Sequence, residues 1–365
     1  MKFAINRDAL LGPLQLVSSV VERRQTIPVL SNLLVVANAD GLSMTGTDQE
    51  VELSARIADV TVNEPGEVTV PARKLVDICR SLPADTELFL EQAEDRVLLK
   101  CGRFKSQLAT LPVGDFPKVP SDESEQVSVT LDAEALKNCL AKTSFAMAQQ
   151  DVRYFFNGLL FDLGEVGLTA GATNGQRLAV TTTDGPGQQS PAQFIVPRKA
   201  VGELSRMVSE GDIRLGFSTN HVSVESGSST LVSKLIDGTF PDYRRAVPEG
   251  ADKVVTCNRH ELREALSRTS ILSNEMYRNV RLQLATGEIR ISANNPMQEE
   301  AEEIVSVEYE GPELEIGFNV SYLLDALSAL AGDVATLSFA DSNTATVIRD
   351  PEDNASVFVV SPMML

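Results

Sequence analysis

Two histidines and four cysteines are the first residues to consider for catalysis or metal binding. His221 and His260 are not spaced with a cysteine as zinc ligands would be, so neither a zinc site nor a histidine-based nucleophile is indicated. The cysteines form no C-x-x-C pair; they are Cys79, Cys101, Cys139 and Cys257. The sequence therefore favours buried free thiols in a reducing cytoplasm over a disulfide scaffold.

Nucleotide hydrolysis would require a glycine-rich phosphate loop. The chain contains no G-x-x-x-x-G-K-[ST] or G-x-G-x-x-G pattern, and residues 171–175 follow a strand-like run without it. Asp48, Glu50 and Glu52 alternate along another strand-like run and could bind a divalent metal ion for a nuclease. A solvated sheet face explains the same alternation more simply. We therefore expect no enzyme activity, no metal site and no cofactor.

The composition indicates a folded protein of more than one domain. A chain of 365 residues exceeds one ordinary core, and 43% hydrophobic with 23% charged residues leaves no room for large disordered regions. The amino-terminal residues lack the apolar stretch of a signal peptide, and no run of about 18 apolar residues occurs. We expect a soluble, cytoplasmic protein.

The chain contains three copies of one pattern. A short alternating run followed by an Asx residue and a helical pattern begins at residues 6, 132 and 258, spaced by 126 residues. Two further landmarks recur in the same order, at 42–48, 168–174 and 289–295 and at 70–78, 196–204 and 318–327. The sequence predicts an α+β fold of three domains, each with two helices and antiparallel sheets. The expected domains are residues 1–121, 122–249 and 250–365.

Sheet edges of repeated domains can pair head to tail, and such contacts close a ring or form a filament. Two chains would give six domains and twelve helices. Helices spaced about 10 Å apart would enclose an opening roughly 28 Å wide. A DNA duplex would fit loosely inside it.

The charge distribution bears on this ring. A net charge of −19 argues against a broad basic surface, but the six expected helical segments carry +4 and the remainder −23. A mildly basic lining would surround DNA without gripping it, because each neutralised phosphate adds affinity. The residues predicted to face DNA are Arg24, Arg73, Arg80, Lys142, Arg198, Lys199 and Arg206. Solvated helix faces without a partner are the alternative.

Longer strings carry a resemblance to a known family. They are TIPVLSNLL (26–34), TGTD (45–48), VPARK (70–74), QDVRYFFNGLLF (150–161), VPRK (196–199), FPDYRR (240–245), ILSNE (271–275), ISANNPMQEEAEE (291–303) and IGFNVSYLLDAL (316–327). Together they resemble the bacterial DNA polymerase III β sliding clamps from end to end. The resemblance implies the DNA clamp fold and a head-to-tail ring of two chains that encloses duplex DNA. It also implies a non-catalytic role as processivity factor in DNA replication.

The resemblance further implies a pocket for a short, largely apolar peptide between the second and third domains. The matching positions are Arg153, Phe155, Phe156, Thr173, Gly175, Gln176, Arg177, Leu178, Pro241, Arg245, Ala246, Val359, Val360, Ser361, Pro362 and Met363. The chain departs from the family at Asn174, Gln176, Ala246 and Ser361, which predicts a wider, more polar pocket. A plain terminal strand is the alternative for the carboxyl-terminal run.

The dimer interface is the last feature that the resemblance implies, at Ile271 and Leu272 opposite the first domain of the other chain. The acidic run at residues 299–303 could face basic residues across this interface, where it would fix the alignment of the two chains more than it would strengthen their binding. The predicted set is Lys74, Arg103, Lys105, Ile271, Leu272, Glu299, Glu300 and Glu303, with Glu302 in the same run. A solvated acidic strand is the alternative.

The partners that the resemblance implies are duplex DNA, a second copy of the chain, and proteins that carry a clamp-binding peptide. These are the DNA polymerase III alpha subunit, other polymerases and repair proteins. An ATP-driven clamp loader is also implied, because ring opening in the family requires separate machinery. A passive oligomeric scaffold unrelated to DNA would share the repeats and ring closure, and remains the alternative.

Overall fold

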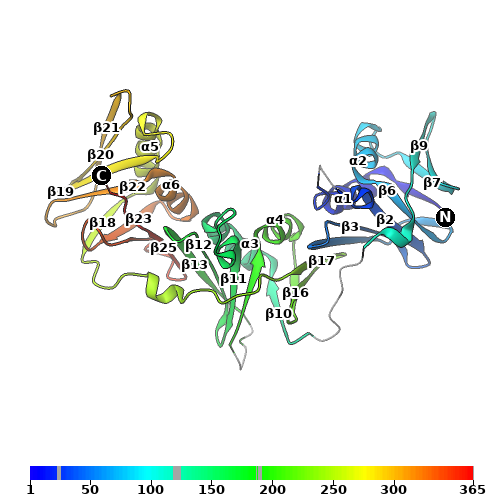
Figure 1. Ribbon diagram of the computed structural model, residues 1–365, viewed down its shortest axis with the longest axis horizontal. Coiled ribbons are helices and arrows are strands. Elements are labelled where there is room, and N and C mark those ends of the chain that lie inside the picture. The colour runs from blue at the N-terminus through cyan, green and yellow to red at the C-terminus, as the bar shows by residue number, and fades with distance from the viewer. Residues whose placement is uncertain (23–25, 118–124, 186, 188–190, 365) are drawn as a thin grey trace. The chain divides into compact units, whose positions relative to one another are not determined.

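The computed structural model describes residues 1–22, 26–117, 125–185, 187 and 191–364 (Figure 1). The chain divides into two compact units. The first is Met1–Leu136 with Lys199–Leu235, and the second is Lys137–Arg198 with Ile236–Leu365. Each unit therefore contains one outer repeat and part of the middle one. In the described ranges, no helix is long and apolar enough to cross a membrane.

Each repeat begins with a strand that runs directly into a helix, as the sequence predicts. Asn6, Asp132 and Asn258 cap these helices, because their side chains accept hydrogen bonds from amides two residues on, at 2.8, 2.8 and 2.9 Å. The α-helices of the described residues are α1 (Arg7–Ser18), α2 (Ala72–Ser81), α3 (Ala133–Thr143), α4 (Arg198–Met207), α5 (Arg259–Thr269) and α6 (Val320–Ala329). Short 3-10 helices are η1 (Pro28–Ser31), η2 (Val113–Asp115), η3 (Ser144–Ala146), η4 (Tyr154–Asn157), η5 (Tyr243–Ala246) and η6 (Ser270–Leu272).

The first unit contains two antiparallel sheets. The smaller has the order β5 (Thr61–Glu64), β1 (Lys2–Asn6), β7 (Glu87–Ala93), β8 (Arg96–Cys101) and β9 (Phe104–Ala109). The larger has the order β10 (Val127–Asp132), β15 (Asp212–Phe217), β16 (His221–Ser226), β17 (Ser229–Lys234), β4 (Val51–Ile57), β3 (Gly41–Thr47), β2 (Asn32–Asn38) and β6 (Gly66–Pro71). Strand β9 is thus one of the two edge strands of the smaller sheet.

The second unit is built in the same way. Its larger sheet has the order β14 (Ala192–Pro197), β11 (Gly158–Gly164), β12 (Gly167–Thr173), β13 (Arg177–Asp184), β25 (Ser356–Val360), β24 (Thr346–Arg349), β23 (Val334–Phe339) and β18 (Lys253–Asn258). The smaller has the order β21 (Glu300–Ser306), β20 (Glu288–Asn294), β19 (Asn279–Ala285) and β22 (Leu314–Asn319). Strand β21 is the edge here.

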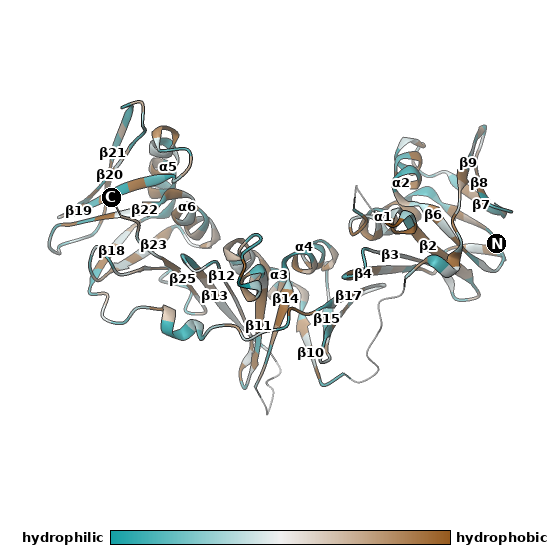
Figure 2. Cartoon of the chain, in the orientation of Figure 1, coloured by the Kyte–Doolittle hydropathy of each residue, from teal (hydrophilic) through white to brown (hydrophobic). Residues whose placement is uncertain are grey.

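The helices pack through one apolar face. Helices α1 and α2 contact each other in the first unit, and α5 and α6 do so in the second (Figure 1). Helix α1 buries Leu10, Leu14 and Val17, and full burial of each such side chain stabilises the fold by about 1.5–3 kcal/mol. Strands β2 and β11 are predominantly hydrophobic (Figure 2). The polar helix faces are left for other contacts.

The four cysteines are free and buried, which confirms the prediction for them. Burial raises the pKa of the Cys139 thiol to about 12 and that of Cys79 to about 11. A thiol with so high a pKa stays protonated near neutral pH and is a poor nucleophile or metal ligand.

Pairing of edge strands joins one repeat to the next within each unit. In the first unit, β4 of the first repeat pairs with β17 of the second, and Leu53 lies opposite Leu231. In the second unit, β13 of the second repeat pairs with β25 of the third, and Ala179 lies opposite Phe358. Leu53 of β4 lies opposite the sixth residue of β3, and Ala179 of β13 lies opposite the sixth residue of β12. Their partners, Leu231 and Phe358, are each the third residue of their own strand. The two junctions therefore use the same strand pair in the same register.

Candidate functional site

The turn between β12 and β13 supplies residues 173–178 of the predicted peptide pocket. The side-chain oxygen of Asn174 accepts hydrogen bonds from the amides two and three residues on, at 2.9 and 3.0 Å, and so shapes the turn. Gly175 has a φ of +88°, and a Cβ atom at this position would lie 3.2 Å from the guanidinium of Arg153. Gly175 therefore allows Arg153 to lie against the turn.

The Arg177 side chain is directed towards α6. Its guanidinium forms an ion pair with Asp325 and donates a hydrogen bond to the carbonyl of Phe145. The same group lies 4.6 Å from the ring centroid of Tyr322 and 5.4 Å from that of Phe145, and the side chain is only 12% exposed. Arg177 therefore joins the β13 strand to α6 of the third repeat.

Tyr322 extends this contact to the surface. Its hydroxyl donates a hydrogen bond to the side-chain oxygen of Gln176 (Oε1) at 3.0 Å and accepts one from the side-chain nitrogen of Asn174 (Nδ2) at 3.3 Å. Gln176 is exposed, and Tyr322 is half-buried. Tyr322 and Asp325 are not among the site residues predicted from the sequence, because helical spacing does not say which turn of another repeat a helix will meet.

Apolar side chains form the floor beside this turn. Leu178 of β13 and Val359 of β25 lie opposite each other and are both buried in one apolar cluster, with Phe155 packed against it. Phe240 and Tyr243, from the segment that joins β17 to β18, belong to the same cluster. The structure thus brings together predicted residues that are far apart in the sequence.

The rim of the site is polar and exposed. Pro241, Arg245 and Ala246 are exposed on the segment that contains η5. Ser361 donates its amide to the carbonyl of Gln176 at 2.8 Å, and Pro362 follows it. Met363 donates its amide to the carbonyl of Gly317 at 2.8 Å, and this bond fixes the carboxyl-terminal run beside β22. Met363 also lines an adjoining hollow of about 430 Å³.

Two further predicted pocket residues, in addition to Arg177, do not fit a ligand-contacting role. Val360 is 1% exposed, and because strand residues alternate it lies on the opposite sheet face from Val359. Phe156 is buried edge-on against Phe155, with their ring centroids 4.7 Å apart. Both residues support the floor from behind.

The basic residues predicted to face DNA differ in their surroundings. Arg73, Arg80 and Arg206 are exposed, although Arg206 also pairs with Glu203 at 2.5 Å. Arg198 is half-buried and donates to the carbonyl of Met147 at 3.1 Å. Arg24 lies outside the described residues.

Lys142 does not fit the prediction. Its ammonium is buried and forms an ion pair with Asp353 at 2.6 Å and a hydrogen bond with Ser356 at 3.3 Å. An inward-facing lysine whose charge is already neutralised cannot reach a phosphate. The helical pattern placed Lys142 on α3 correctly but did not reveal the carboxylate below it.

Asp48, one of the alternating acidic residues considered for a metal site, has a structural role. One carboxylate oxygen accepts hydrogen bonds from the amides of Glu50 and Val51, at 2.9 and 2.8 Å, and the other pairs with Lys199. Lys199 also pairs with Glu22 at 2.8 Å, which leaves it less free to bind a phosphate. Among the residues that the structure describes, no group of three His, Cys, Asp or Glu side chains could hold a metal ion.

The predicted interface residues are divided between the two units, on helices as well as at sheet edges. Lys74, Arg103 and Lys105 are exposed in the first unit, on α2 and around the start of β9. In the second unit, Ile271 is 77% exposed and Leu272 is half-buried.

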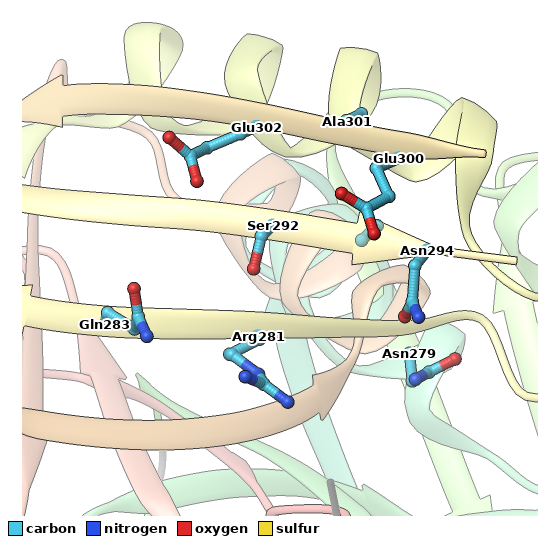
Figure 3. A pocket seen from close by; sticks show the side chains of 9 residues that line it. Asn279, Arg281, Gln283, Ser292, Asn294, Glu300, Ala301 and Glu302 are labelled. Atoms are coloured by element: carbon cyan, nitrogen blue, oxygen red, sulfur yellow. The ribbon is translucent and has the colours of Figure 1, made fainter. Parts of the chain in front are cut away.

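The acidic run of β21 is divided between the two faces of its sheet. Glu303 is bound by Arg268 of α5 at 2.6 and 3.0 Å, and these hydrogen bonds hold the pKa of the Glu303 carboxyl below its usual range. Glu300 and Glu302 lie on the other face, around a hollow of about 550 Å³ that they line with Arg281 (Figure 3). Glu299 accepts a hydrogen bond from Asn295 at 2.6 Å. Glu300 and Glu302 therefore carry the charge on this outer face, where Glu302 also pairs with Arg290 at 3.3 Å.

Comparison with known proteins matches the chain along its whole length. Three family descriptions match in succession: the N-terminal domain of the DNA polymerase III beta subunit at residues 1–120, its central domain at 130–242 and its C-terminal domain at 244–364. The beta sliding clamps of Pseudomonas putida and Escherichia coli K12 are 50% and 45% identical, with 100% of both chains covered. The crystal structure of a DNA polymerase sliding clamp from Pseudomonas aeruginosa matches with a TM-score of 0.94 at 48% identity, again over both whole chains.

Three α+β repeats joined by their sheet edges define a clamp protein of the three-domain type. The chain belongs to the family of the bacterial DNA polymerase III beta subunit.

Replacing Arg177 by lysine tests whether this residue joins two repeats. Lysine keeps the charge but loses the planar group that contacts Asp325, the Phe145 carbonyl and two rings, so we expect the free energy of unfolding of the second unit to fall by about 1–3 kcal/mol. Arg281→Lys in the same unit is the matched control, because Arg281 is 45% exposed and pairs with Glu315 at 3.3 Å, so its replacement should cost less than about 0.5 kcal/mol. Calorimetric unfolding measures both; equal losses would contradict this role for Arg177.

Proposed function

We infer that this chain is a DNA sliding clamp that confers processivity on a DNA polymerase. The observation that carries this conclusion is the match of three successive beta-subunit domains over the full chain, with relatives at 45–50% identity. The family is the non-catalytic processivity subunit of a DNA polymerase, and its partners are DNA and polymerases. We place the domains at residues 1–121, 122–249 and 250–365, and the protein in the cytoplasm.

Ring closure by two chains follows from the two junctions inside one chain. Each junction pairs the fourth strand of one repeat (β4 or β13) with the last strand of the next repeat (β17 or β25). The fourth strand of the third repeat, β21, and the last strand of the first repeat, β9, both lie at sheet edges. We propose that β21 of one chain pairs with β9 of the other, since an unpaired edge is a template for another strand.

The register of this proposed pair can be transferred from the two junctions. Ala301 lies opposite Ala293, the sixth residue of β20, and so corresponds to Leu53 and Ala179. Ser106 is the third residue of β9. Ser106 should therefore face Ala301, which puts Lys105 opposite Glu302 on the outer face.

DNA contact is proposed to be weak and electrostatic. Of the residues predicted to face DNA, Arg73, Arg80 and Arg206 are exposed on helices, and Arg198 and Arg24 are further members of the proposed set. A few such contacts in a chain of net charge −19 favour sliding over tight binding.

The peptide site is proposed to bind the replicative polymerase alpha subunit, other polymerases, repair proteins and the clamp loader. A sliding clamp from Pseudomonas aeruginosa, 48% identical to this chain, has been solved bound to griselimycin. The proposed ligand-contacting set is Arg153, Phe155, Thr173, Gly175, Gln176, Leu178, Pro241, Arg245, Ala246, Val359, Ser361, Pro362 and Met363, with Tyr322 added. Its buried apolar floor and polar rim are typical of a peptide site. Gln176, Ala246 and Ser361 make it more polar and wider than is usual in the family.

Retention on circular DNA tests the proposed function. The purified chain, loaded on nicked circular DNA by a clamp loader with ATP, should remain bound through gel filtration and be released when the circle is cut. Release on cutting indicates a topological link rather than adhesion. Failure to stay on the circle, with a loader that retains a control clamp, would favour the scaffold alternative instead.

Charge reversal tests the proposed interface register. Lys105→Glu and Glu302→Lys should each weaken the dimer by about three- to tenfold in dissociation constant, because each places like charges opposite each other, and the double variant should restore it. Sedimentation at low salt measures the dimer, since salt screens exposed charges. Lys2→Glu on β1, which lies three strands from β9 in the same sheet, is the matched control and should have a smaller effect. A double variant as weak as the single ones would contradict the register.

A further inference from the structure

The segment that joins β17 to β18 carries three residues of the proposed peptide site. Residues 236–252 are described throughout and contain η5 as their regular element. The backbone hydrogen bonds of η5 are local, from the amides of Arg245 and Val247 to carbonyls three residues earlier. Such bonds curl the segment but do not fix η5 on the sheet. Ile236, at the start of the segment, donates its amide to the carbonyl of Ile195 on β14 at 2.9 Å, so the position of η5 further along must depend on side chains.

Two of these side chains enter the apolar cluster. Phe240 and Tyr243 are buried there together with Leu178 and Val359, which form the floor of the proposed site. Apolar contacts of this kind hold a segment down but have little directionality. A directional contact is needed to set the angle at which Pro241, Arg245 and Ala246 stand above the floor.

Asp162 of β11 supplies such a contact. One carboxylate oxygen accepts a hydrogen bond from the Tyr243 hydroxyl at 3.0 Å and another from the Arg244 guanidinium at 3.1 Å. The Arg244 guanidinium also lies 4.5 Å from the centroid of the Tyr243 ring. The Asp162 side chain is only 8% exposed, and a buried carboxylate without donors would be costly. Burial, and then the negative charge of Asp162, raise the pKa of Tyr243 to about 12, so its hydroxyl remains a donor.

We propose that Asp162 is a positioning residue of the peptide site, which acts by anchoring Tyr243 and Arg244 so that the segment after β17 presents Pro241, Arg245 and Ala246 to a bound peptide. Asp162 itself lies below the segment and does not contact the peptide. The proposal rests on the peptide site of the proposed function.

Two variants separate anchoring from general stability. Tyr243→Phe keeps the buried ring and removes the hydroxyl donor, and Asp162→Asn keeps the shape and removes the charge. Each should weaken binding of a labelled leucine- and phenylalanine-rich pentapeptide by about tenfold, mainly through faster dissociation, because one directional bond to a charged acceptor is lost. The double variant should be little weaker than either single one, because both remove the same contact.

Asp350→Asn is the matched control. Asp350 is a buried carboxylate of the same unit that accepts hydrogen bonds from the amides of Gly332 and Glu352 and touches no residue of the proposed site. The Asp350→Asn substitution should lower the melting temperature without changing the rate of peptide dissociation, measured about 20 °C below the melting temperature.

The outcomes are distinguishable. Peptide dissociation unchanged in Tyr243→Phe and Asp162→Asn, with melting lowered as in Asp350→Asn, would reduce Asp162 to a structural residue and leave the peptide site intact. A parent chain that binds neither the pentapeptide nor griselimycin would overturn the peptide site and this proposal with it.

Discussion

Pairing between the edge strands of successive repeats is the interaction on which the rest of the structure depends. The β4–β17 pair continues one sheet from the first repeat into the second, and the β13–β25 pair continues another from the second into the third. Hydrogen bonds between the two strands satisfy the backbone N–H and C=O groups of both edges at once. Each repeat therefore covers an exposed strand of its neighbour that could otherwise pair with another molecule and aggregate. In a single chain β9 and β21 each pair with a neighbouring strand on one side only, which is why a second chain is expected to complete the structure.

Charged side chains reinforce these junctions and thereby reduce the number of free cations. Lys199 pairs with Asp48 in the first unit, and Lys142 and Arg177 pair with Asp353 and Asp325 in the second. In all three pairs a basic residue of the middle repeat meets a carboxylate of an outer repeat. Partly buried pairs of this kind fix geometry more than they add stability. Basic residues on helices are therefore not automatically a DNA-binding surface.

Much of the fold could be predicted from the sequence because its signals are local. The Asx residues at 6, 132 and 258 mark helix starts through hydrogen bonds to amides only two residues away, and their regular spacing revealed the repeat. The site was harder to predict, since it depends on contacts between repeats. Tyr322 and Lys142 lie on helices where they were expected, yet the turn that Tyr322 meets and the carboxylate that Lys142 meets are set by sheet register. That register is not encoded in any single segment.

The proposed contact between two chains repeats the contact within one chain, and disulfide cross-linking tests this pairing most directly. Cysteines at Ser106 and Ala301 should face each other across the proposed pair, at the roughly 4.5–5.5 Å between Cα atoms that a disulfide tolerates, while the native cysteines are buried. Mild oxidation of Ser106→Cys/Ala301→Cys should give a covalent dimer, whereas Ser106→Cys/Glu302→Cys, one residue out of register, should not. Equal cross-linking of both variants, or none in the first, would contradict the account.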